Sequence, residues 1–455
     1  MDSNSFDEQN IKPENTTPVE TEAPVEPVAE APVEPAPEAL IMDDVPEESK
    51  KKQKGLMTGL SLAFLILIVV IIVVVLTMTT QKNNSGSENG GSTSNNGQEE
   101  SGSSALTIDD LSSGMVTTTI GGRTVSYKAK YIVDGVVAEV KGGTYESTDD
   151  GEVVFLVING GALSLDGVTV NKTGSEDFDG RGDSYSFYGT NSAIVVVGEG
   201  SQAGLANVTI NTSVDGANAV VATNSGSVVS GDITINTTKD SSRGLHATYG
   251  GKIVNNGGTI TTQGQSCAAL ATDRGAGTVK VSGMKLSTSG AGSPLIYSTG
   301  EIDVASSTGT ATGAQIAVVE GKNSVEITDC EFSTNGIGNR NQVDNAAVMI
   351  YQSMSGDASE GVGSFMAENS SFTVLSDSSA YQITPFFFVT NTEATIELSD
   401  VKASFYEDGY FVLAAGTNEW GKTGKNGGTV TIEATNLEAT NTNVGVDEIS
   451  LVNGL

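Results

Sequence analysis

A short apolar segment recurs along this chain at intervals of about 25 residues, each copy bounded by Gly, Asn and Ser. Its copies begin 26, 25, 24 and 26 residues apart, at Ile194, Val220, Leu245, Ala269 and Leu295. A second series runs in step with it at intervals of 25, 25 and 26 residues, at Ile210, Ile235, Ile260 and Leu286. No stretch of this region shows the periodicity of an amphipathic helix. Two series that keep a common period predict a β-solenoid.

The repeat predicts an all-β domain over residues 106–455. Two or three short strands cannot bury an apolar face alone, whereas stacked copies close a continuous core. Equivalent hydroxyl side chains should also stack, at Thr223, Thr248, Thr272 and Ser298. About 350 residues give at most about 14 turns, and the irregular segments 174–190 and 336–360 reduce this to about 10–13. We expect parallel strands and no reversing hairpin, because each turn advances along one axis.

Residues 1–49 differ from the rest in composition. They hold 14 acidic residues against one Lys, and 8 of the 10 prolines of the chain. Proline disfavours helix and sheet interiors, like charges repel, and little apolar surface is left to bury. We expect a disordered tail. It is either a solvated chain that binds no partner or a docking site for a partner.

An uncharged apolar run follows the tail. The basic segment 50–54 contains four lysines and precedes residues 55–80, which are long enough to cross a bilayer as a helix. The positive-inside rule places residues 1–49 in the cytoplasm and the repeat domain outside the cell. No Ala-x-Ala cleavage site follows the run, so we predict an uncleaved, single-pass signal-anchor. Residues 81–105, rich in Ser, Gly and Asn, form a flexible linker.

Charge and cysteine content restrict the chemistry further. The net charge of −33 argues against nucleic acid or another anionic polymer as a partner, unless a cation bridges the two, because like charges repel. Cys267 and Cys330 are the only cysteines and lie 63 residues apart, about two and a half repeats. This separation is too large for a disulfide, so we predict two unpaired, buried thiols.

Several segments of the repeat domain resemble a known family. They are residues 186–193 (SFYGTNSA), 318–325 (VVEGKNSV), 348–357 (VMIYQSMSGD) and 388–392 (FVTNT). The array resembles the right-handed parallel β-helix of the pectate-lyase-like superfamily, and in particular adhesin-like bacterial cell-surface proteins. Polygalacturonase-like members carry Asn-Thr-Asp, Gly-His-Gly and Arg-Ile-Lys segments. None of these occurs here, so the resemblance implies the architecture and no catalytic residue.

An acidic loop is the first candidate site. Asp177, Asp179 and Asp183 surround two glycines and supply the oxygen ligands that Ca²⁺ prefers, although the spacing is not that of an EF-hand. The alternative is a solvated loop with no metal. The same loop contains the tripeptide Arg181-Gly182-Asp183, which some integrins bind.

His246 and Asp273 are the candidates for acid–base chemistry. His246 is the only histidine and aligns by repeat with Val221, Leu270 and Ile296, which predicts a packed residue and not a general base. Asp273 lies beside Arg274, a pair that suits either a glycosidase carboxylate or an exposed ion pair in a turn.

Aromatic residues gather near the C-terminus. Tyr406, Tyr410 and Trp420 are candidates for stacking on sugar rings. The alternative is that the aromatic residues there, Phe386–Phe388 and Tyr410–Phe411 among them, fill the core or seal the end of the stack.

Together these features favour a membrane-anchored, adhesin-like extracellular β-helix protein that binds glycan or protein without catalysis. One alternative is a membrane-tethered polysaccharide lyase or hydrolase, and another is a structural spacer.

Overall fold

The computed structural model describes residues 105–338, 345–353, 355–375, 385–405, 410–416, 427–441 and 451–453. The chain divides into two units, Met1–Thr58 and Gly59–Leu455, and every described residue belongs to the second. The predicted tail, basic segment, membrane span (55–80) and all but the last residue of the linker lie outside the described residues. Within the described ranges, no helix is long and apolar enough to span a membrane.

The described residues form two long β-sheets. The first sheet has 13 strands: β1 (Ser112–Ile120), β2 (Arg123–Asp134), β5 (Glu152–Ile158), β8 (Ile194–Val197), β11 (Val220–Thr223), β13 (Leu245–Thr248), β15 (Leu270–Thr272), β17 (Ile296–Ser298), β20 (Ala317–Glu320), β23 (Val348–Tyr351), β26 (Phe387–Thr390), β29 (Val412–Ala414) and β32 (Leu451–Asn453).

The second sheet has 19 strands in the described residues: β3 (Val137–Lys141), β4 (Thr144–Ser147), β6 (Ala162–Asp166), β7 (Thr169–Lys172), β9 (Gln202–Ala206), β10 (Thr209–Thr212), β12 (Ser227–Thr237), β14 (Gly251–Thr262), β16 (Gly277–Thr288), β18 (Glu301–Ala305), β19 (Thr308–Ala311), β21 (Ser324–Thr328), β22 (Glu331–Thr334), β24 (Val362–Glu368), β25 (Ser371–Val374), β27 (Thr392–Ser399), β28 (Lys402–Phe405), β30 (Gly428–Thr435) and β31 (Glu438–Asn441). A 3₁₀ turn, η1 (Ile108–Asp110), and a short helix, α3 (Asp183–Tyr188), complete the described elements.

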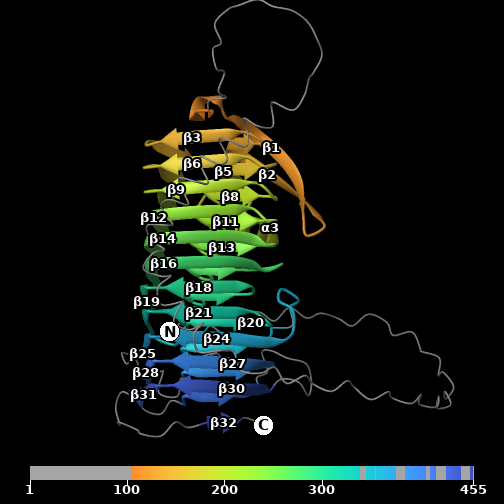
Figure 1. Ribbon diagram of the computed structural model, residues 1–455. Coiled ribbons are helices and arrows are strands. Elements are labelled where there is room, and N and C mark those ends of the chain that lie inside the picture. Colours follow the sequence, from red (N-terminus) through yellow and green to blue (C-terminus); the bar gives the residue numbers. More distant parts are fainter. Residues whose placement is uncertain are drawn as a thin grey trace, which may run out of the picture. The chain divides into compact units, whose positions relative to one another are not determined.

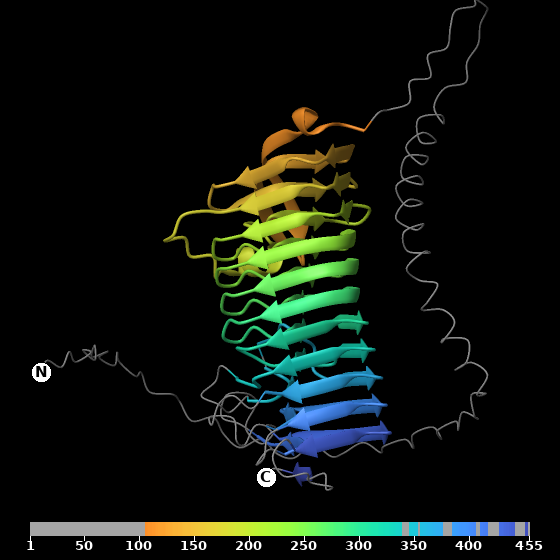
Figure 2. The same ribbon diagram turned by 90° about the vertical axis from the view of Figure 1, so that its left-hand side faces the viewer.

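Each coil consists of one strand of the first sheet followed by strands of the second sheet (Figure 1). Strands of successive coils pair in parallel, as in the β11–β13 and β12–β14 ladders. Figure 2 shows the second-sheet strands lying side by side from the first coil to the last. Apart from β1 and β32, eleven strands of the first sheet each begin a full coil, which agrees with the expected 10–13. This all-β arrangement with long parallel sheets fits a β-helix.

The aliphatic column predicted from the second series is confirmed. Ile210, Ile235, Ile260 and Leu286 pair in register through β10, β12, β14 and β16, and each is at most 1% exposed. Along β12, buried side chains alternate with more exposed ones, as a strand with one face on the core requires. The column therefore belongs to the apolar core that runs through the coils.

The first series needs a correction of one residue. Leu245 pairs with Leu270, and Leu270 pairs with Ile296, so Ala269 and Leu295 each lie one position before the true register. Because side chains alternate between the two faces of a strand, this shift exchanges the inner and outer face. Ala269 and Leu270 are both buried and apolar, so the sequence pattern does not distinguish them.

The shift also divides the predicted hydroxyl column. Thr223 and Thr248 pair in register, and the Thr248 hydroxyl donates to Thr223 Oγ1 over 2.8 Å. Thr272 pairs instead with Ala247, which faces the core. Thr272 Oγ1 donates to Ser298 Oγ over 3.5 Å. The four residues thus form two pairs on opposite faces of the sheet and not one column.

One pair of strands is antiparallel, contrary to the expectation of no reversing hairpin. β1 and β2 form a hairpin that turns through Gly121 and Gly122, both at positive φ. Its side chains pack on the face of the first sheet that points away from the core, hereafter the outer face, against Leu156, Val195 and Val221. Burial on both faces explains why β8 and β11 are apolar or buried at every position.

Both cysteines are free and buried, as predicted. Each stands in a column of small side chains that accept a hydrogen bond from the backbone of an adjacent coil. Cys267 Sγ accepts from the amide of Ser242 at 3.0 Å, and Cys330 Sγ accepts from the amide of Ser307 at 3.4 Å. Serine fills the neighbouring positions, so each cysteine acts as a serine substitute inside the stack.

Candidate functional site

Two interruptions of the repeat meet at Arg274, which follows β15. Its Nη1 donates to Asp183 Oδ2 over 2.8 Å, and its Nε donates to Asp357 Oδ1 over 2.7 Å. The guanidinium carbon also lies 4.0 Å from the centre of the Phe187 ring. Asp183 and Phe187 belong to the insertion between β7 and β8, whereas Asp357 belongs to the segment between β23 and β24. One side chain of a regular coil thus joins both irregular segments.

Two of the three predicted calcium ligands pair with arginine side chains. Asp179 Oδ1 accepts from Arg181 Nε at 3.0 Å, and this hydrogen bond lowers the pKa of Asp179 below its usual value. Asp183 pairs with Arg274. No group of three or more His, Cys, Asp or Glu side chains that could hold a metal ion lies within the described part of the chain. In this structure Asp177, Asp179 and Asp183 do not converge on one point.

The outer face of the first sheet carries a belt of polar residues between two apolar patches. Apolar residues cover this face at the coils of β2 to β11, and again around Val318, Met349 and Phe388. Arg243, His246 and Asp273 lie between the two patches, and Tyr297, Glu320 and Tyr351 border the second patch; we name these six residues the polar belt.

Asp273 is the charged centre of the polar belt. Its Oδ2 lies 3.3 Å from Arg243 Nη2 and 3.9 Å from His246 Nε2. Burial raises the pKa of Asp273 to about 6, although Arg243 opposes this shift. The expectation of an exposed ion pair in a turn is wrong, because Asp273 is 4% exposed and Arg274 points towards other carboxylates.

His246 is packed, as predicted, but on the outer face and not in the core. It pairs in register with Val221 and Ala271, and not with Leu270. The side chain is fully buried, and neither ring nitrogen has a hydrogen-bond partner among the described residues. Burial, together with Arg243, lowers the pKa of His246 well below its usual value, so the ring is neutral.

Glu320 is the second carboxylate of the polar belt and is 1% exposed. Three hydroxyl groups donate hydrogen bonds to it. The Tyr297 and Tyr351 hydroxyls donate to Oε2 over 2.7 and 3.0 Å, and the Ser353 hydroxyl donates to Oε1. Burial raises the pKa of both tyrosines well above the usual value, so they stay protonated as donors. No motif in the sequence marks this cluster, because its members come from three separate coils.

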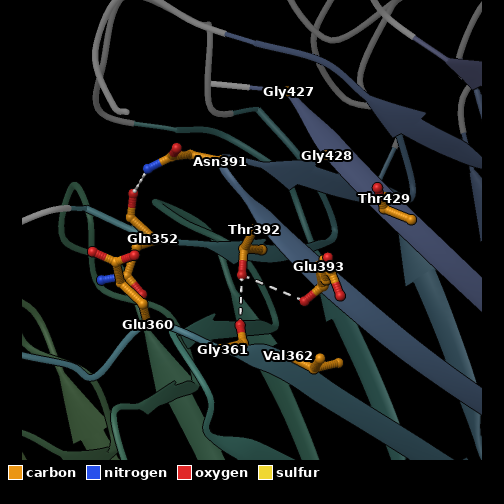
Figure 3. A pocket seen from close by; sticks show the side chains of 10 residues that line it. All are labelled: Gln352, Glu360, Gly361, Val362, Asn391, Thr392, Glu393, Gly427, Gly428 and Thr429. Carbon is orange, nitrogen blue, oxygen red and sulfur yellow. Dashed lines mark hydrogen bonds between the residues drawn. The ribbon is translucent and has the colours of Figure 1, made fainter. Parts of the chain in front are cut away.

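A pocket opens on the coils of β24, β27 and β30 (Figure 3). Its volume is about 540 Å³, and ten residues line it: Gln352, Glu360, Gly361, Val362, Asn391, Thr392, Glu393, Gly427, Gly428 and Thr429. Parallel pairing places Val362, Glu393 and Thr429 in one row across three successive coils. Sequence reasoning missed this pocket, since no motif joins these residues and only the coil register does.

Internal hydrogen bonds hold the wall of the pocket. The Asn391 side-chain amide donates to the backbone oxygen of Gln352 over 2.7 Å, and the Thr392 hydroxyl donates to the backbone oxygen of Gly361 over 3.0 Å (Figure 3). Gln352 Nε2 donates to the backbone oxygen of Ala358 over 3.3 Å. Gln352 is 3% exposed, and its Oε1 has no hydrogen-bond partner among the described residues.

Only one of the predicted sugar-stacking residues is described. Tyr410 is 37% exposed and lies just before β29, whereas Tyr406 and Trp420 fall outside the described residues. The neighbouring phenylalanines behave as the alternative predicted. Phe386, Phe387 and Phe411 are at most 1% exposed, and their rings pack within 4.9–5.6 Å of one another in the core.

Comparison with known proteins gave no match: no family model, no curated protein and no solved structure is similar to this chain. The likeness to pectate-lyase-like and adhesin-like proteins stays a prediction from the sequence.

Proposed function

We propose that this chain is a non-catalytic, adhesin-like surface protein whose β-helix binds glycan at the pocket between β24 and β30. The pocket is the observation that supports this. It presents carboxylate, amide and hydroxyl groups from three coils, and such groups can bond the hydroxyls of a sugar. Val362 lines the same pocket at 48% exposure and offers an apolar contact for the C–H face of a sugar ring.

The proposal extends to the placement of the protein. Residues 55–80 anchor it in the cell membrane in a single pass, with the acidic tail in the cytoplasm and the β-helix outside the cell. The helix is right-handed, as in the pectate-lyase-like superfamily, because parallel crossovers in one sheet are right-handed in nearly all proteins. The apolar run, its flanking lysines and the parallel sheets support this arrangement.

A second candidate is a membrane-tethered polysaccharide lyase or hydrolase. Asp273 favours it, because a carboxyl with a pKa of about 6 suits general acid catalysis near neutral pH. A glycosidase also needs a second carboxyl across a groove. Asp273 and Glu320 are both nearly inaccessible, so a substrate would reach them only after the loops joined by Arg274 moved apart.

A glycan array probed with the full-length chain in detergent, together with an assay for released sugar, tests these alternatives. Binding without turnover supports the surface-binding function, and turnover lost in Asp273→Asn supports the enzyme. If neither glycan binding nor released sugar is detected, the structural spacer remains as the function.

Two glycine variants locate the site. A Cβ built on Gly427 or on Gly204 meets no atom within 4 Å, and neither glycine has positive φ, so a side chain is tolerated at both. Gly427 lines the pocket, whereas Gly204 lies on β9. We expect Gly427→Phe to abolish glycan binding and Gly204→Phe to leave it intact. Equal binding by both variants would overturn the assignment to this pocket.

A further inference from the structure

The first sheet ends in a strand with an open edge. β1 stands at the end of the strand order, and β2 is its only partner among the described residues. Ile120 and Arg123 close the hairpin, so residues of β1 bond β2 alternately from this pair onwards. The backbone groups of Met115, Thr117 and Thr119 therefore point away from β2. Figure 1 shows the hairpin running from the first coil along the flank of the stack.

This edge lacks the usual protection against pairing with another strand. β1 contains no charged residue and no proline, and its one irregularity lies between Ser112 and Gly114, ahead of the regular part. Beyond the β1–β2 ladder, the one hydrogen bond that described residues make to the backbone of β1 is donated by Asn224 Nδ2 to the carbonyl of Thr119 over 3.3 Å. Met115 is 65% exposed. The rest of the edge is open to a further strand.

The second sheet is protected at the same end of the stack. Leu106 pairs with its first strand, β3. The Leu106 amide donates to the Val137 oxygen over 2.9 Å, and the Glu139 amide donates to the Leu106 oxygen over 3.0 Å. β4, the other second-sheet strand of that coil, has only four residues, and very short edge strands pair weakly. β1, with nine residues, has neither form of protection.

A second copy of this chain suits the open edge for reasons of charge and symmetry. Copies with a net charge of −33 repel one another, and the repulsion is weakest where both approaching strands are uncharged. The described charges next to β1 lie on β2, at Arg123, Lys128, Lys130 and Asp134, and Lys128 pairs with Asp149. In a β2–β1–β1–β2 sheet the two β2 strands are about 14 Å apart, beyond the Debye length of about 8 Å. Antiparallel pairing of two identical edges also leaves neither edge open.

We propose that β1 pairs antiparallel with β1 of a second copy, with the two Thr117 residues opposite each other. This register follows from the positions of the open groups, since Met115 and Thr119 lie symmetrically about Thr117. Each Met115 then bonds Thr119 of the other copy, and all three open residues of both edges are paired. The exposed Met115 side chain gains a neighbour across the interface. This self-association goes beyond glycan binding and does not depend on it.

Disulfide trapping in the full-length chain in detergent tests the register. Across a pair that exchanges both hydrogen bonds the Cα atoms are about 5.5 Å apart, so two Thr117→Cys chains can form a disulfide. The two Thr119 positions would be about 13 Å apart along the strands, which is too far. Under mild oxidation we expect a covalent dimer from Thr117→Cys and none from Thr119→Cys. Cys267 and Cys330 are buried and do not contribute. Equal yields from the two variants, or no dimer from Thr117→Cys, would overturn the inference.

A charge at the edge gives a test without covalent chemistry. Thr117→Lys places two ammonium groups opposite each other in the dimer and should raise its dissociation constant by about fivefold, because like charges directly opposite are destabilising. The matched control is Thr124→Lys, which adds the same charge to the exposed face of β2, one strand away from the edge. Sedimentation of both variants in detergent measures the two dissociation constants. Equal dissociation constants would contradict pairing through β1.

Hydrogen exchange shows what covers the edge. At a concentration where the chain is monomeric, the amides of Met115 and Thr117 should exchange fast and that of Val116, which bonds β2, slowly. Exchange of Met115 and Thr117 should slow as the dimer forms. Protection of these two amides in the monomer would assign the edge to another segment of this chain, such as residues 81–104, and would overturn the pairing of two copies.

Discussion

Arg274 and Asp357 lie 83 positions apart in the chain, and Arg274 Nε donates a hydrogen bond of 2.7 Å to Asp357 Oδ1. The same guanidinium binds Asp183, 91 positions away in the other direction. Arg274 therefore joins both irregular loops. Each loop also has a contact of its own with the coils, since the Thr248 hydroxyl donates to the backbone oxygen of Phe187 and the Lys322 amide donates to that of Ser359.

Replacement of Arg274 should release both loops together. Arg274→Gln loses charge-assisted hydrogen bonds to the partly buried Asp357 and the exposed Asp183, and we expect a cost of about 2 kcal/mol in local opening free energy, mostly from the Asp357 contact. Hydrogen exchange should rise in residues 174–190 and 355–361 and stay constant in β12 and β14. The control is Arg181→Gln, which removes an exposed ion pair with Asp179. Faster exchange in only one loop would contradict the shared attachment.

Asp273 should make the folding stability of the protein fall as the pH rises. Its pKa is raised from 3.8 to about 6, so the folded state holds a proton that the unfolded chain releases. The resulting stability is fully present below pH 3.8 and is lost as the pH rises through about 6. The sign is opposite for Asp149 and Asp179, whose hydrogen bonds to Lys128 and Arg181 lower their pKa values.

Denaturation of wild type and Asp273→Asn at about pH 4 and about pH 7 measures how much Asp273 contributes to the free energy of unfolding at each pH. The free energy of unfolding of wild type, relative to the variant, should fall by about 2.4 kcal/mol over that range. A constant difference would show that Asp273 titrates normally in the folded protein.

The two thiols should be inert in the folded protein. Burial raises the pKa of Cys267 to about 12 and that of Cys330 to about 11, so neither forms a thiolate near neutral pH. We expect no alkylation of the native chain and two labelled cysteines after denaturation. Cys267→Ser should fold normally, because serine occupies the neighbouring positions of its column. A disulfide on a non-reducing gel would contradict the coil register.

The stability of the protein should depend on the volume of the side chains in the aliphatic column. Ile235 is fully buried between Ile210 and Ile260, so Ile235→Ala should cost about 3 kcal/mol and Ile235→Val about 1 kcal/mol. Thr234, one position earlier in the same strand, lies outside the core, and Thr234→Ala is the matched control. Equal loss of stability at both positions would show that the core does not lie on the Ile235 face of β12.

Calcium titration tests the predicted metal site. Because Asp179 and Asp183 are engaged by arginines, we expect no heat of binding at about 1 mM Ca²⁺, the weak end of calcium sites in extracellular modules. A saturable signal that Asp177→Asn removes would establish the site and would require the loop to rearrange.

The sequence predicts the stack well where one face of a strand is apolar and the other polar. Ile210 and Ile235 follow this pattern, and their register is correct. The pattern fails at Ala269 and Leu270, where both faces are buried and a slip of one residue leaves no trace in hydrophobicity. That slip aligned His246 with Leu270 and Ile296, whereas the true register aligns it with Ala271 and Tyr297.

The sites were harder to predict for a related reason. Val362 and Thr429 share a pocket only because three coils of unequal length bring them into register. Arg274 meets Asp183 through loops whose paths the repeat does not determine. Contacts between like positions can be read from a period, whereas contacts made by insertions depend on side chains that have no counterpart in other coils.

The position of Arg274 has a mechanical consequence. Coils of a solenoid touch only their neighbours, so tension along the stack passes through each interface in series. Arg274 binds residues from an earlier and a later coil, and it therefore acts as a tie in parallel with the interfaces between them. Under tension along the stack, the interfaces between β8 and β23 share the load with this tie, whereas the interfaces outside that span carry the load alone. The stack should therefore yield first outside that span, while its middle stays intact.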